Sequence, residues 1–283
     1  MRSRYWLLLL ALGPATAFAW GDDCKFRADR AGGVDAKGIE KVVIRAGAGD
    51  MKVVGRSNAV RVEARGTACA GKQELVDATQ ISVRREGNVV YVETTLPQNN
   101  DGSWNWGKGE YAYIDIGIAL PSSVPVEAID SSGDTEVEDL AALTLQDSSG
   151  DLEIRRIAGA LDVGDSSGDI GIDEAGSVRV RDSSGDIEIQ NVRTDVNVTS
   201  DSSGDIHIVQ VAGAVRVEQD SSGSIRVEDV RGNVNVDSDS SGDIYAGRVG
   251  GDFTVSEDSS GSIDHDAVSG KVTIPENKRD SDD

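Results

Sequence analysis

The stretch DSSGDIEIQNVRTDVNVTS, residues 182–200, is one copy of a unit that fills the C-terminal half of the chain. Each unit opens with Asp-Ser-Ser-Gly, and the next copy follows after 17–19 residues. The eight copies start at Asp130, Asp147, Asp165, Asp182, Asp201, Asp220, Asp239 and Asp258. Self-similarity at a period close to 20 residues is typical of solenoids, in which each repeat forms one structural layer.

Apolar residues alternate with polar ones inside each unit. Ile187 and Ile189 are separated by one polar residue, and so are Val196 and Val198. Two-residue spacing is the period of a β-strand with one face turned inward, and Ile and Val are frequent in strands. The pattern predicts two short strands per unit, joined by turns.

Alignment of the units yields five inward positions per unit, and 38 of these 40 positions are apolar. Burying five aliphatic side chains contributes roughly 1.5–3 kcal/mol each. Ordering the backbone costs about 1–2 kcal/mol per residue, so a unit can fold only when neighbours share its core. We therefore predict that residues 121–274 form an all-β, single-stranded parallel β-helix or β-solenoid, right-handed by the crossover rule.

The residues before the repeats show the same alternation of apolar and polar residues, but less regularly. Apolar alternation over 42–44, 51–53 and 111–120 indicates strands, and Glu86-Gly87-Asn88 indicates a hairpin turn. We interpret residues 20–120 as an irregular β region that caps the first layer of the solenoid. Residues 275–283 form a polar tail.

The N-terminus has the pattern of an export signal. Arg2 and Arg4 precede a short apolar run over residues 7–12, and Ala17-Phe18-Ala19 supplies the small residues at which a signal peptide is cut. Residues 1–19 are thus predicted to be a signal peptide cleaved after Ala19, with a buried N-terminal helix as the alternative. The run is too short for stable membrane insertion. Export to the periplasm or to the outside follows.

Charge excludes one class of partner. The chain has 28 Lys and Arg against 50 Asp and Glu, a formal net charge of −22, and loss of the signal makes it more negative. Such a surface repels phosphate groups, so we expect no nucleic-acid binding.

The two cysteines, Cys24 and Cys69, are an even number in a chain destined for an oxidising compartment. A disulfide between them is the prediction. A reactive thiol or a metal pair is the alternative, but the spacing is not that of a CxxC motif and no histidine is near in sequence.

The eight aspartates that open the units are the most regular polar feature. We expect them to lie on one ridge in contact with water, where they could bind calcium, as the Asp- and Gly-rich turns of calcium-binding β-rolls do. The alternative is purely structural, since Asp at the first and Gly at the fourth position suit a type I turn. Two units have Ser224 and Ser262 where the others have a second Asp, which favours the structural interpretation.

Trp104 and Trp106 lie in a glycine-containing segment before the repeats. Exposed tryptophans can stack on sugars, which would make these two a glycan-binding site. Alternatively they cover the apolar end of the solenoid, which would otherwise be exposed to water.

Catalytic residues are not indicated. The two histidines, His207 and His265, fall at an outward strand position and in an inward column of the last unit, and neither has a nucleophile with an orienting partner in the pattern. The coil length varies by only two residues, so the repeats contain no long insertion that could form the sides of an active-site cleft. We expect no enzyme and no cofactor other than the calcium considered above.

The segments GAGDMKVVG (47–55) and IDIGIALP (114–121), followed by SSGDIEI-type units, resemble an exported bacterial family of adhesin-like β-strand-repeat proteins, a domain of unknown function. The resemblance covers the chain after the signal and implies a solenoid in an exported protein. We thus expect a non-enzymatic structural or interaction protein of the bacterial envelope whose partner is an unidentified envelope or surface component. The alternative is a calcium- or polysaccharide-binding module.

Overall fold

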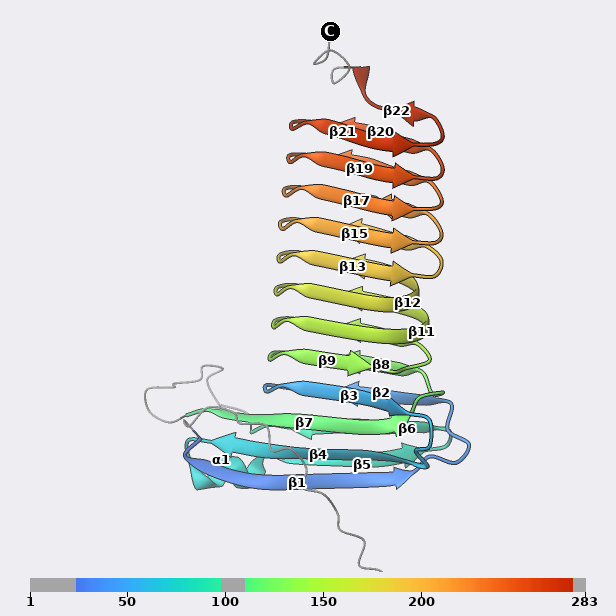
Figure 1. Ribbon diagram of the computed structural model, residues 1–283. Helices are drawn as coiled ribbons and strands as arrows, with labels where there is room; N and C mark the ends of the chain where they lie inside the picture. The colour runs from blue at the N-terminus through green and yellow to red at the C-terminus, as the bar shows by residue number, and fades with distance from the viewer. Residues whose placement is uncertain (1–23, 98–109, 277–283) are drawn as a thin grey trace, which may run out of the picture.

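The computed structural model describes residues 24–97 and 110–276, which form a tall stack of coils above a wider region at one end (Figure 1). A coil consists of a strand on face 1, a corner, a strand on face 2 and a DSSG turn that leads to the next coil. Successive coils pair in parallel along both faces. The predicted parallel β-solenoid is confirmed, while its hand stays a prediction.

The strands of the repeats alternate between the two faces. Face 1 contains β9 (Thr135–Glu138), the first part of β11 (Leu152–Gly164) and of β12 (Ile170–Arg181), β13 (Ile187–Val192), β15 (Ile206–Val211), β17 (Ile225–Val230), β19 (Ile244–Val249) and β21 (Ile263–Val268). Face 2 contains β8 (Val126–Ile129), β10 (Leu143–Gln146), the second part of β11 and of β12, β14 (Val196–Ser200), β16 (Val215–Val217), β18 (Val234–Asp239), β20 (Phe253–Asp258) and β22 (Val272–Thr273).

The register places equivalent residues of neighbouring coils above one another. Ile187 pairs with Ile206, and Ile206 with Ile225. These side chains point between the two faces and are fully buried in one continuous core. The apolar columns expected from the alignment therefore form the core. In the last coil Ile263 and Val268 are only half-buried, because no further coil among the described residues covers them.

The N-terminal strands extend both faces. They are β1 (Phe26–Asp35), β2 (Lys41–Arg45), β3 (Met51–Arg56), β4 (Arg61–Ala70), β5 (Gln80–Glu86), β6 (Val89–Thr95) and β7 (Ala112–Pro121), with a short helix α1 (Gln73–Ala78). Along face 1 the order is β1–β4–β7–β3–β9, and along face 2 it is β5–β6–β2–β8. The pairings of β1, β4 and β5 are antiparallel.

One part of the 20–120 region belongs to the stack itself. The strands β2 and β3 form a coil that pairs in parallel with β8 and β9 on one side and with β6 and β7 on the other. Its turn has Gly49 with φ +118°, beneath Gly133 of the first DSSG turn. This coil is not evident from the repeat pattern, because its turn reads Gly-Ala-Gly-Asp and because four strands intervene before the next coil in the chain.

The rest of this region closes the end of the stack. The expected hairpin is confirmed, with β5 and β6 joined at Gly87. The helix α1 was not predicted; its Val76 is buried in a small second core with Ala68 and Ile114. No helix among the described residues is long and apolar enough to cross a membrane.

Candidate functional site: the stacked DSSG turns

The glycine of each DSSG turn adopts a backbone conformation that other residues rarely adopt. Its φ lies between +116° and +139° in the eight turns, a region that L-residues rarely occupy. The turns also stack closely, so that a Cβ added to Gly204 would lie 1.9 Å from the carbonyl oxygen of Gly185. Glycine is therefore required both by the turn and by the coil beneath it.

The first aspartate of each turn is buried, contrary to the ridge in contact with water that the sequence led us to expect. The eight side chains are between 0 and 6 % exposed: Asp130, Asp147, Asp165, Asp182, Asp201, Asp220, Asp239 and Asp258. The carboxyl group turns inward toward the N–H groups of the serines that follow. The N–H of Ser202 donates to Oδ1 of Asp201 at 2.7 Å, and that of Ser241 donates to Oδ1 of Asp239 at 3.2 Å. We call these eight residues the Asp column.

Burial raises the pKa of the carboxyl groups from Asp130 to Asp239 in the Asp column. Desolvation raises the pKa of Asp130 and Asp220 to about 7. Repulsion by the neighbouring Asp147 acts in the same direction on Asp130, whereas the N–H of Ser131 lowers its pKa in part. Desolvation is also the main cause of the raised pKa of Asp147, Asp165, Asp182, Asp201 and Asp239.

The second aspartate, directly after the glycine, is exposed and links one coil to the next. Oδ1 of Asp186 accepts the N–H of Asp205 at 2.9 Å, and Oδ1 of Asp205 accepts the N–H of Ser224 at 2.8 Å. The same bond joins Asp50 to Asp134 at the start of the stack. Sequence analysis noted this aspartate only where it is replaced, so its bridging role was missed.

A column of left-handed residues lies at the end of the face 1 strands, where the chain approaches the corner. Eight residues other than glycine have φ between +53° and +62° there: Asp139, Arg156, Glu174, Asn191, Gln210, Asp229, Arg248 and Ala267. A left-handed L-residue costs roughly 1–2 kcal/mol. Two ion pairs offset part of this cost, because Nε of Arg156 lies 2.8 Å from Oδ1 of Asp139 and Nε of Arg248 lies 2.6 Å from Oδ1 of Asp229.

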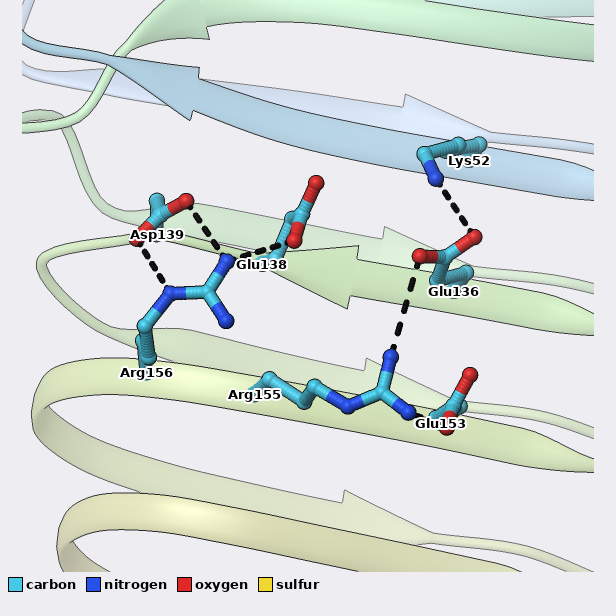
Figure 2. Close-up of polar contacts among 7 residues, drawn as sticks. All are labelled: Lys52, Glu136, Glu138, Asp139, Glu153, Arg155 and Arg156. Carbon is cyan, nitrogen blue, oxygen red and sulfur yellow. Dashed lines mark hydrogen bonds and ion pairs between the residues drawn. The ribbon is translucent and has the colours of Figure 1, made fainter.

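Charged side chains on face 1 also pair between coils (Figure 2). Nζ of Lys52 lies 2.6 Å from Oε2 of Glu136, and Nη1 of Arg155 lies 3.9 Å from the other oxygen of that carboxylate. Arg155 also pairs with Glu153 in its own strand, and Arg156 contacts Glu138 at 2.5 Å. Exposed ion pairs contribute about 0–1 kcal/mol each to the free energy of unfolding. This network therefore adds little to the stability of the fold.

Calcium binding by the Asp column stays the untested alternative to a structural turn. Within the described residues no three acidic, His or Cys side chains gather as metal ligands. The carboxyl groups stand in single file, one per coil, whereas calcium takes six to eight oxygen ligands. The site's geometry therefore favours a turn with a structural role.

The other predicted residues that the structure describes lie outside the DSSG turns. Cys24 and Cys69 are joined by a disulfide with Cα atoms 5.6 Å apart. His207 is on the outer surface of face 1, and His265, expected in an inward column, is exposed on the last coil near the ring of Phe253. Trp104, Trp106 and the signal peptide lie outside the described residues.

Two surface depressions border the corners. One is lined by residues that include Gln210, Asp229, Arg231 and Arg248, and the other by residues that include Arg56 and Asp139. Neither depression contains a histidine or a cysteine in its lining.

Comparison with known proteins identifies the class to which this solenoid belongs. The chain matches the Toastrack DUF4097 family over residues 36–228. That match spans more than half of its length, from the coil formed by β2 and β3 to the middle of the repeats. The protein belongs to this family, as the resemblance in its sequence led us to expect.

Several solved structures are similar in part. They include a "putative cell adhesion protein" from Clostridium sporogenes (13 % identity, TM-score 0.34, covering 88 % of this chain and 99 % of that one). A "putative adhesin" from Bacteroides fragilis has 15 % identity and a TM-score of 0.34, with coverage of 89 % and 98 %. A "putative lipid binding protein" from Parabacteroides distasonis has 15 % identity and a TM-score of 0.45, with coverage of 86 % and 96 %. Comparison with curated proteins finds no match.

Proposed function

We propose that this protein is a non-enzymatic, exported interaction protein of the bacterial envelope that uses the outer surface of its solenoid as an adhesin-like binding face. The observation that carries the proposal is the regularity of the stack. Coils of 17–19 residues place outward side chains in straight rows at intervals of about 4.8 Å, which is a surface suited to an extended partner.

One row on face 1 has the chemistry of a contact surface. Glu188, His207, Arg226, Tyr245 and Asp264 follow one another in register on successive coils. The guanidinium group of Arg226 lies over the ring of Tyr245, 4.3 Å from its centre. Tyr and Arg are enriched in protein interfaces, where they combine a broad apolar area with hydrogen bonding.

The surroundings of the two histidines favour a non-enzymatic role. His207 is the second residue of this row, with Nε2 3.9 Å from a carboxylate oxygen of Glu228. His265 is on the last coil. Nucleophilic catalysis requires a base within hydrogen-bond reach of Ser, Cys or Thr, with a third group to orient that base. Among the described residues, the two histidines interact with Glu228 and Phe253, and neither is a nucleophile of this kind.

A sedimentation assay with defined envelope components tests this proposal. The purified mature protein is mixed with peptidoglycan sacculi or with outer-membrane vesicles, and the bound fraction is measured at increasing salt. We expect binding to one of these probes, and the double variant Arg226→Glu/Tyr245→Ala should weaken it about tenfold, the equivalent of roughly 1.4 kcal/mol.

The variant Asn235→Ala, on the outer surface of face 2, serves as the matched control and should bind as the wild type does. Melting curves of all variants establish that the fold is intact. Binding that is unaffected by the double variant would contradict the assignment of this row. Binding to neither probe, or turnover of either, would overturn the function itself.

A further inference from the structure

We propose that the buried carboxyl groups from Asp130 to Asp239 in the Asp column retain protons well above the pH at which an exposed aspartate loses them, and share them with neighbouring carboxyl groups, so that mild acid stabilises the solenoid and neutral or alkaline pH weakens it. This goes beyond the proposed binding function, because it concerns the interior of the turns and not the outer rows.

The first argument is geometric. Both carboxylate oxygens of Asp147, Asp165, Asp182 and Asp220 are inaccessible to solvent and make no hydrogen bond of normal geometry. An ionised carboxylate in that position would lose its hydration and find only the serine N–H groups of its own turn in exchange, at a large cost. A protonated carboxyl group is neutral and can donate to an oxygen above or below it. Asp220 and Asp239, on successive coils, form such a pair.

The second argument concerns the surrounding charges. The charged groups that raise the pKa values in the column are themselves carboxylates. They are the neighbouring members of the column and three aspartates that directly follow a turn glycine: Asp50, Asp151 and Asp186. The polar groups that face the column are the serine N–H groups of the same turn and, at Asp130, the hydroxyl of Thr135 at 3.4 Å. Among the described residues, no Lys, Arg or His side chain is among the main groups that act on these carboxyl groups, so a proton is the neutralising group that we propose.

The direction of the pH dependence follows from the raised pKa values. An unfolded aspartate has a pKa near 3.9, while that of Asp130 and Asp220 in the fold is about 7. Between these values the folded state binds more protons than the unfolded state. The free energy of unfolding therefore falls as the pH rises from about 4 to about 7, and it levels off above that range.

Replacement of Asp220 by Asn tests this directly, because Asn has nearly the same shape and no charge. Melting temperatures are measured from pH 4.5 to pH 8.5 for the wild type, Asp220→Asn and the exposed matched control Asp205→Asn. We expect the wild type to melt at least about 5 °C lower at pH 8 than at pH 5. The Asp220→Asn variant should melt higher than the wild type at pH 8 and show a shallower pH dependence.

The control Asp205→Asn keeps the oxygen that accepts the N–H of Ser224 and should retain the slope of the wild type. If Asp220→Asn fails to fold, Asp182→Asn provides the same comparison. Infrared spectra provide an independent readout, since protonated carboxyl groups have a carbonyl band that ionised ones lack. That band should be present at pH 6 in the wild type.

Two results would overturn the proposal. One is a melting temperature that does not change between pH 5 and pH 8, together with no band from protonated carboxyl groups. The other is a rise in the melting temperature of the wild type at pH 8 on addition of calcium chloride that Asp220→Asn abolishes. The second result would assign the column to cations and not to protons.

Discussion

The residues of the DSSG turn differ in which neighbour constrains them. The glycine is constrained by its own dihedral angles and by the glycine of the coil below, whose carbonyl oxygen occupies the place of a side chain. The first aspartate is enclosed by the turn, and the second holds an N–H of the following coil. Five adjacent residues thus combine constraints within one coil with constraints between coils.

Replacing the glycine of a central turn should therefore be costly. We expect Gly204→Ala to lower the free energy of unfolding by about 2–4 kcal/mol, because it combines a strained φ of +129° with a clash against Gly185. Urea unfolding followed by circular dichroism measures the loss. Gly87→Ala in the β5–β6 turn is the control, since its φ of +63° is also left-handed but no atom lies within 4 Å of an added Cβ.

The control should cost only about 1 kcal/mol, the strain of the left-handed conformation alone. Equal losses at the two positions would show that stacking of the turns adds nothing to the requirement for glycine.

At the scale of the strand, the position of a strand in the stack decides how much its core side chains contribute to the free energy of unfolding. A strand of a central coil, such as β15, pairs in parallel with a strand on each side. The strand β21 pairs only with β19 among the described strands, and its apolar residues are half-buried. The sequence pattern of the two strands is similar, whereas their burial is not.

We therefore expect the same truncation to have different costs in the two strands. Ile208→Ala in β15 should destabilise the fold by about 2–5 kcal/mol, since the side chain is fully buried and leaves a cavity. Ile263→Ala in β21 should cost about 1 kcal/mol, because part of this side chain already contacts water. Urea unfolding of both variants measures these costs. Equal costs would contradict the conclusion that the core is partly exposed at the last coil.

At the scale of the whole molecule, a linear stack has two different ends. The N-terminal end is closed by the antiparallel strands β1, β4 and β5 together with α1, and the disulfide ties the segment before β1 to β4 (Figure 1). Each coil contacts mainly its neighbours, so stability is distributed along the axis and local opening can occur without global unfolding.

Loss of the disulfide should therefore act locally. The bond closes a loop of 45 residues, for which the chain-entropy model yields about 4 kcal/mol. We expect the double variant Cys24→Ala/Cys69→Ala to lose hydrogen-exchange protection in β1 and β4 while β15 keeps its protection. Wild-type protein under reducing conditions should behave in the same way. A uniform loss of protection along the stack would contradict independent coils.

Comparison of the sequence with the structure shows which features depend on local pattern. The repeat and the two-residue alternation were enough to predict the coils, their turns and the inward columns, because a β-strand with one buried face must alternate. The glycine requirement was also visible, since four-residue turns have strong preferences. The corner column was not predicted, because its residues, such as Arg156 and Gln210, have no side-chain property in common.

What the sequence by itself determined is the coil: its length, its two strands, its turn and the residues that face inward. Only the tertiary structure decided the order of the coils, in which β2 and β3 lie between strands that follow them in the chain, and the burial of the Asp column. The physical reason is that alternation and turn preference act within about 20 residues. Burial of a turn carboxyl group and the choice of strand partners depend instead on which coils lie above and below.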